Sequence, residues 1–160
     1  MNSIFDRFKS GYLYPGPLTG DIHDVQVTTN ITTAYVNCKN FPITCFFLQR
    51  GFTTDAIDVF KVVQATDSSG TGVKDVTGLA LTAFTGIDTV GDVACLELDA
   101  EALDVANSFT HAAVVFSLGA DTGVNNICVW YVQGQARYAH RALNARVAAD
   151  AAASMIKLMS

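Results

Sequence analysis

The sequence has few charged residues and lacks a long uninterrupted apolar run. Of its 160 residues 16% are charged, whereas half are hydrophobic. No apolar stretch reaches the ~20 residues that a transmembrane helix needs, so we expect no membrane association. The first residues, Met1 to Lys9, mix acidic, basic and aromatic side chains and contain no apolar signal-peptide core. We therefore expect the protein to be made in the cytoplasm.

Sequence motifs of common catalytic and metal-binding sites are also missing. The chain contains no GxSxG, HExxH, Walker A or EF-hand pattern. No cysteine or histidine group has the spacing of zinc ligands. His111 begins an apolar, strand-like run, where a histidine is far more often a packed residue than a base. We predict no catalytic residues, no cofactor-binding residues and no metal ligands, and therefore a protein that is not an enzyme.

The cysteines are even in number, which leaves disulfide bonds open. Cys45, Cys95 and Cys128 lie within apolar, strand-like runs, where cysteine behaves as a small hydrophobic residue. Because no secretory signal is visible, we expect four free thiols. Cys38 and Cys45 flank a proline-containing turn, and for this pair a bridge stays open.

Acidic residues are concentrated in the middle of the chain, and basic residues at its end. The formal net charge is −5, and eleven of the 15 acidic residues lie between residues 55 and 121, together with two lysines. The last 24 residues carry Arg137, Arg141, Arg146 and Lys157. An acidic body repels phosphate, so we expect no nucleic-acid binding. Attraction between the body of one copy and the tail of another favours a homo-oligomer.

Residues 25–138 have the pattern of a β domain. Val25, Val27 and Ile31 alternate with polar residues, at the period of a half-buried strand. Further strand-like segments follow at short intervals; they are residues 34–38, 44–49, 56–65, 73–77, 79–84, 92–98, 109–118 and 126–133. We predict an all-β fold, an antiparallel β-sandwich of jelly-roll or immunoglobulin-like type.

Turn signals separate these segments. Residues 66–72 are rich in Gly, Ser, Thr and Asp, which tolerate positive φ or bond to their own backbone. Residues 119–123 predict a hairpin connection between the last two strands. Between two other strands, residues 100–106 predict a helical turn with Asp99 as its N-cap.

The two ends differ from this domain in composition. Residues 1–24 contain a Gly-, Pro- and Tyr-rich stretch that predicts an extended arm. Residues 139–160 are alanine-rich and predict an amphipathic C-terminal helix with one apolar stripe. Each end could pack on its own sandwich or on another subunit. As contacts to other subunits we predict Phe5, Phe8, Tyr12, Tyr14, Leu143, Val147, Met155 and Leu158.

Several short segments resemble small head-associated virion proteins of tailed bacteriophages. They are Val63–Gly78 (VQATDSSGTGVKDVTG), Leu96–Asp99 (LELD), Phe109–Val115 (FTHAAVV) and Gln135–Tyr138 (QARY). The resemblance covers residues 57–138, about half of the chain. It implies a β-rich, non-catalytic capsid accessory protein, such as a decoration or minor capsid subunit. It brings no catalytic residues with it.

These observations lead to three functional hypotheses. The first is a virion structural protein, a capsid decoration (cement) or minor head protein, which binds the major capsid protein or other virion proteins. The second is a neck or tail connector subunit. The third is a small carbohydrate-binding or other ligand-binding β-barrel, in which Trp130 and Tyr131 stack on the ligand. The apolar run around Trp130 favours a core position for this residue.

Overall fold

The computed structural model describes residues 8–14, 30–53, 56–82, 91–119 and 125–134. Within these ranges the chain forms strands and two short 3-10 helices, η2 and η3. In chain order they are β1 (Phe8–Tyr14), β2 (Ile31–Thr32), β3 (Val36–Asn37), β4 (Ile43–Thr53), β5 (Ile57–Ala65), β6 (Lys74–Thr82), β7 (Val93–Asp99), η2 (Ala100–Ala102), η3 (Val105–Asn107), β8 (His111–Leu118) and β9 (Asn125–Gly134).

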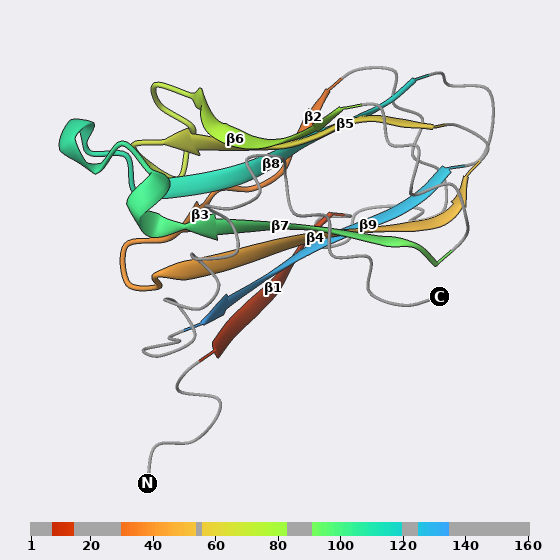
Figure 1. Cartoon of the computed structure of the whole chain (residues 1–160), viewed down its shortest axis with the longest axis horizontal. Coiled ribbons are helices and arrows are strands. Elements are labelled where there is room, and N and C mark those ends of the chain that lie inside the picture. The colour runs from red at the N-terminus through yellow and green to blue at the C-terminus, as the bar shows by residue number, and fades with distance from the viewer. Residues whose placement is uncertain (1–7, 15–29, 54–55, 83–90, 120–124, 135–160) are drawn as a thin grey trace, which may run out of the picture.

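The strands form two antiparallel sheets that lie one above the other (Figure 1). Sheet A has the strand order β1-β9-β4-β7, and sheet B has the order β2-β8-β5-β6, with β3 also paired to β8. The fold is therefore all-β and a β-sandwich, which confirms the predicted fold class. The predicted segments between residues 34 and 133 all contain a strand, and the two predicted at 73–77 and 79–84 join in the single strand β6.

Chain connections mostly cross from one sheet to the other. Among the strands described, β5 and β6 are consecutive in sequence and pair directly. The predicted hairpin between the last two strands is wrong, because β8 belongs to sheet B and β9 to sheet A. A Gly- and Asp-containing connection fits a hairpin and a crossover equally well. In the structure β8 and β9 are each buried in the middle of their own sheet, and this placement determines which strands they pair with.

Apolar residues from both sheets form one core between the layers. Sheet A contributes Phe46 and Leu48 of β4, and sheet B contributes Phe60 and Phe116; all four side chains are fully buried. In β5 and β8, Phe60 lies opposite Phe116 and Val62 opposite Val114, so aromatic and β-branched side chains meet across the strands. This core fixes the inner face of each sheet and leaves the outer faces for other contacts.

A polar bridge ties the two layers together at one end of the core. Gln133 of β9 is fully buried. Its Nε2 donates to the backbone oxygen of Asn37 at 3.0 Å and to Oγ1 of Thr44 at 3.1 Å. A buried amide that lacked such partners would destabilise the fold. Gln133 therefore joins β9 and β4 of sheet A to β3 of sheet B.

The turn predicted for residues 66–72 is confirmed, because these residues lie in the hairpin loop between β5 and β6. Asp67 Oδ1 accepts hydrogen bonds from the backbone N–H groups of Ser69 and Thr71 at 2.9 and 3.1 Å. Gly70 has φ of +82°, which favours glycine, and a Cβ at this position would lie 2.7 Å from the Tyr35 ring. The loop geometry therefore lets Tyr35 lie against it.

The two predicted ends are described only in part. Residues 8–14 of the expected arm form β1, which pairs with β9 of the same chain at the edge of sheet A. The helix predicted for residues 139–160 lies outside the described residues, as does most of the strand predicted from residue 25. Asp99 caps η2 as predicted, because its side chain accepts a hydrogen bond from the Glu101 N–H.

Candidate functional site: the outer face of sheet A

Alternation along β9 places half of an apolar run on the outside of the sandwich. Ile127, Val129, Tyr131 and Gln133 point into the core and are buried. The residues between them, among them Trp130, are half-buried and point outward. Side chains of consecutive strand residues lie on opposite faces. Trp130 and Tyr131 therefore cannot stack together on one ligand, and the expected core position belongs to Tyr131 and not to Trp130.

Neighbouring strands extend this apolar surface on both sides of β9. Phe47 of β4 lies opposite Trp130, and their rings stack with centroids 5.3 Å apart and planes 9° apart. On the other side of β9, Tyr12 of β1 lies opposite Trp130 and is 76% exposed. Three aromatic residues from three strands thus form a row across the outer face. We call the outward residues of these strands and of β7 the sheet A outer face.

A second apolar group lies toward the end of the same face. Phe8 is 53% exposed, and it lies so close to Gly134 that a Cβ there would be 3.1 Å from the Phe8 ring. Val132 of β9 and Cys45 of β4 lie opposite each other beside it and are half-buried. Glu97 of β7 carries a charge at the border of this face. The exposed side of sheet A therefore presents apolar and aromatic groups where a sandwich facing only water usually carries polar ones.

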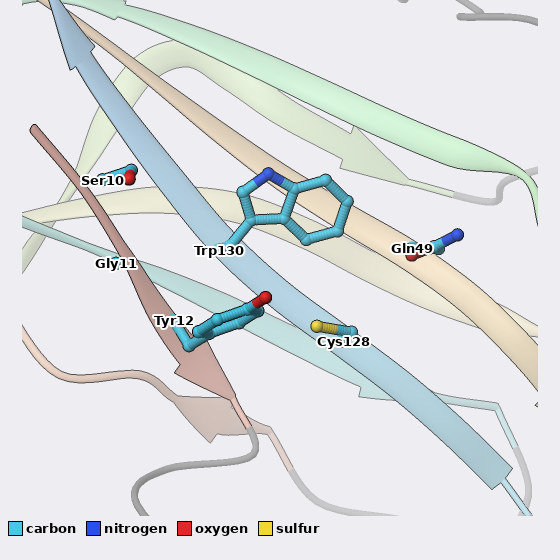
Figure 2. A pocket seen from close by; sticks show the side chains of 6 residues that line it. All are labelled: Ser10, Gly11, Tyr12, Gln49, Cys128 and Trp130. Atoms are coloured by element: carbon cyan, nitrogen blue, oxygen red, sulfur yellow. The ribbon is translucent and has the colours of Figure 1, made fainter. Parts of the chain in front are cut away.

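A pocket of about 420 Å³ opens at the Tyr12 end of the face. Its described lining residues come from β1, β4 and β9, and they are Ser10, Gly11, Tyr12, Gln49, Cys128 and Trp130. Figure 2 shows the side chains of Tyr12 and Trp130 next to each other, with Cys128 and Gln49 beyond them. Gly11 has no side chain, and this leaves room for the Tyr131 ring, which a Cβ would approach to 2.8 Å. None of the six residues carries a charge.

The outer face of sheet B is closed by the chain itself. Val63, Ala113 and Val115 point outward from β5 and β8, yet they are buried, and Tyr35 packs against them. Burial raises the pKa of the Tyr35 hydroxyl. An ion pair between Lys61 and Asp75, 2.8 Å long, adds a polar group to this sheet. The apolar residues of this face are already covered within one chain.

All four cysteines are free thiols, as predicted. Cys38 is fully buried and bonded by Thr44 and Gln133 in the core, and burial raises its pKa. Cys45 and Cys95 instead lie on the sheet A outer face. A hydrogen bond from the Cys95 thiol lowers the pKa of Cys45 and raises that of Cys95. The two cysteines that meet are thus on adjacent strands, and the pair flanking the turn is not bridged.

The predicted contact residues have different outcomes. Phe8 and Tyr12 are strongly exposed on β1. Tyr14 ends β1, but its side chain lies outside the description, as do Phe5, Leu143, Val147, Met155 and Leu158. The sequence reasoning missed Phe47 and Val132 and assigned Trp130 to the core. Alternation along β9 predicts that Trp130 and Val132 share one face, but only the structure shows that this face points outward.

The described part of the chain lacks two features. These residues contain no group of three or more His, Cys, Asp or Glu side chains arranged to hold a metal ion. They also contain no helix long and apolar enough to span a membrane.

Comparisons of the chain with protein-family models, curated proteins and solved structures found no match.

Proposed function

We propose that this protein is a non-enzymatic structural subunit of a virion, a capsid decoration or minor head protein that binds the phage shell through protein–protein contacts. In this proposal the docking surface is the part of the sheet A outer face formed by Phe8, Val132, Cys45 and Phe47. The major capsid protein is the partner. The same contacts would serve a neck or tail connector, in which further copies of this chain are the partners.

The observation that carries the proposal is an apolar outer face on a sandwich whose core is already complete. Exposed apolar clusters of this kind mark protein–protein interfaces. Burial of such a surface gains about 25 cal/mol per Å², of which ordering and association costs cancel a large part. Large aromatic anchors surrounded by smaller apolar residues are typical of the residues that dominate binding energy. Phe8, 53% exposed and seated over Gly134, has this character.

The virion assignment rests on sequence. The likeness to small head proteins of tailed bacteriophages runs from β5 through β8 and beyond β9. The segments that carry it include the β5–β6 loop and the end of β7 next to η2. Of the described segments, Val63–Gly78 belongs to sheet B and its hairpin loop, and Leu96–Asp99 places Glu97 at the border of the sheet A outer face.

The test is incorporation into particles. A Phe8→Ala, Val132→Ala double variant should enter purified virions poorly, because loss of an anchor weakens binding about 30-fold. The matched control is Val73→Ala with Val105→Ala, since both valines are strongly exposed but lie away from sheet A, at 50% and 61% exposure. Mass spectrometry of purified particles measures the copies retained.

Three outcomes would decide the matter. Normal incorporation of the control with loss of the Phe8 and Val132 variant supports the docking surface. Equal incorporation of both variants contradicts it, and absence of the wild-type chain from purified virions contradicts the virion role. Native mass spectrometry separates the two structural roles, because a closed ring in the absence of the shell favours the connector.

A further inference from the structure

The pocket at Tyr12 and Trp130, whose lining residues are shown in Figure 2, begins at Ser10, two residues along β1 from Phe8. Its volume of about 420 Å³ falls in the ~300–1,000 Å³ range of small-molecule sites. The docking contacts proposed above do not explain a hollow of this size. Two aromatic side chains, one amide and one hydroxyl at its walls point to a ligand with flat apolar faces and polar edges.

We propose that this pocket binds a neutral saccharide, with a sugar ring against Tyr12 and Trp130 and its hydroxyl groups toward Gln49 and Ser10. A pyranose ring presents C–H groups on its faces and hydroxyl groups at its rim. Tyrosine and tryptophan offer a large apolar surface together with a polar group at the ring edge. Gln49 and Ser10 can each donate and accept hydrogen bonds, as sugar hydroxyl groups require.

One wall of the pocket is held in place before any ligand binds. Trp130 lies on β9, between β1 and β4, and its ring is stacked on Phe47 at a centroid distance of 5.3 Å. Tyr12, 76% exposed, lies on the adjacent strand, where its ring can meet a ligand. Binding would therefore order the Tyr12 side chain but cost little side-chain freedom at Trp130.

The chemistry of the described lining favours an uncharged ligand. No lysine or arginine is among these six residues, so none of them offers a cationic partner to a phosphate or carboxylate. Burial raises the pKa of the Cys128 thiol, which keeps it uncharged at neutral pH. Aromatic slots can also bind proline-rich segments, and such a peptide is the competing occupant.

The single tryptophan of the chain makes the test direct. Because Trp130 is the only tryptophan in the sequence, its fluorescence reports on the pocket alone. The purified full-length chain is titrated with methyl glucoside, methyl galactoside, N-acetylglucosamine, maltose and cellobiose, and separately with oligoproline. We expect a saturable change with at least one sugar, with a Kd on the order of 1 mM, and no change with oligoproline.

Variants show whether the response comes from the proposed contacts. Tyr12→Ala should raise the Kd about tenfold, and Gln49→Ala should raise it as well. Phe8→Ala, on the same strand but outside the pocket, should leave it unchanged. Circular dichroism checks that each variant is folded, and Gln49→Ala, at an exposed position of β4, keeps the test valid if the Tyr12 variant does not fold.

Two results would overturn the inference. One is a saturable response to oligoproline and to no sugar, which would make the pocket a peptide site. The other is no response to any sugar from a folded chain. Both are measured without virions, so they do not depend on whether the docking proposal holds.

Discussion

Two central strands, β8 of sheet B and β9 of sheet A, are both rich in apolar residues but differ in what surrounds them. Each is a nearly continuous apolar run at the middle of its sheet. Residues 112–118 of β8 are buried on both faces, whereas β9 alternates between buried and half-buried residues. The difference lies in what covers the outer face. Tyr35 packs over β8, and no described residue of the chain takes the same place over Trp130.

The comparison teaches that an apolar strand does not by itself indicate a core. On sheet B the outward residues belong to the stability of the fold. On sheet A no described residue covers them in this way, and this is why both proposals are placed there. Matched substitutions on the outer faces of the two sheets test this difference.

The largest effect is expected for a charge placed under Tyr35. Ala113→Asp buries an unpaired carboxylate at a fully buried position of β8, and it should reduce the free energy of unfolding by about 3–5 kcal/mol. The matched change on sheet A is Val132→Asp, for which we expect less than about 1 kcal/mol because the site is half-exposed. Urea denaturation measures both. Similar losses at the two sites would remove the distinction between the faces.

Removal of the covering ring should have a smaller effect. Tyr35→Ala exposes Val63, Ala113 and Val115, and we expect a loss of about 2 kcal/mol in the free energy of unfolding. Tyr12→Ala removes a ring that is 76% exposed, so its effect should stay within about 0.5 kcal/mol. Tyr35→Phe serves as the control that keeps the covering ring. Thermal unfolding of the three variants measures these differences. An unchanged stability of Tyr35→Ala would show that the fold does not need the covering ring.

The stacking of Phe47 on Trp130 should contribute less to the free energy of unfolding than the Tyr35 ring does. Phe47→Leu keeps an apolar side chain but removes the ring that lies on Trp130, and we expect a loss of about 1 kcal/mol. A double-mutant cycle with Trp130→Leu isolates the coupling between the two residues. Additive losses would mean that the stack does not hold Trp130 in place.

The smallest effect concerns the hairpin loop that lies against Tyr35. Hydrogen bonds from Thr71 and Ser69 hold the pKa of Asp67 below its ordinary value of 3.8. A carboxylate with a lowered pKa stabilises the fold above the ordinary value, and this contribution is lost as the pH falls through the folded-state pKa. Asp67→Asn keeps the acceptor oxygen and removes the titration. Between about pH 5 and pH 2 the variant should lose less thermal stability than the wild type; parallel curves would contradict this.

Much of the local structure could be predicted from the sequence. Alternation and apolar runs predicted the strands between residues 34 and 133. The turn residues predicted the loop that contains Asp67, and Asp99 was predicted as an N-cap. The apolar sequence neighbours of Cys45, Cys95 and Cys128 agree with the free thiols that the structure shows. The candidate site was predicted only in part. Phe8 and Tyr12, in the segment predicted to be an arm, are exposed on β1, and their role as contacts to other subunits stays a prediction. Phe47 and Val132 had no signal of their own in the sequence.

The sequence by itself determined that this chain is β-rich, with strands separated by turns, because those features depend on neighbouring residues. The tertiary structure alone decided that β8 and β9 belong to different sheets and that Trp130 faces outward. It also placed Cys45 beside Cys95 rather than beside Cys38. Each of these depends on pairing between segments far apart in the chain, and two apolar strands of 8 and 10 residues carry no local mark of which partner will cover them.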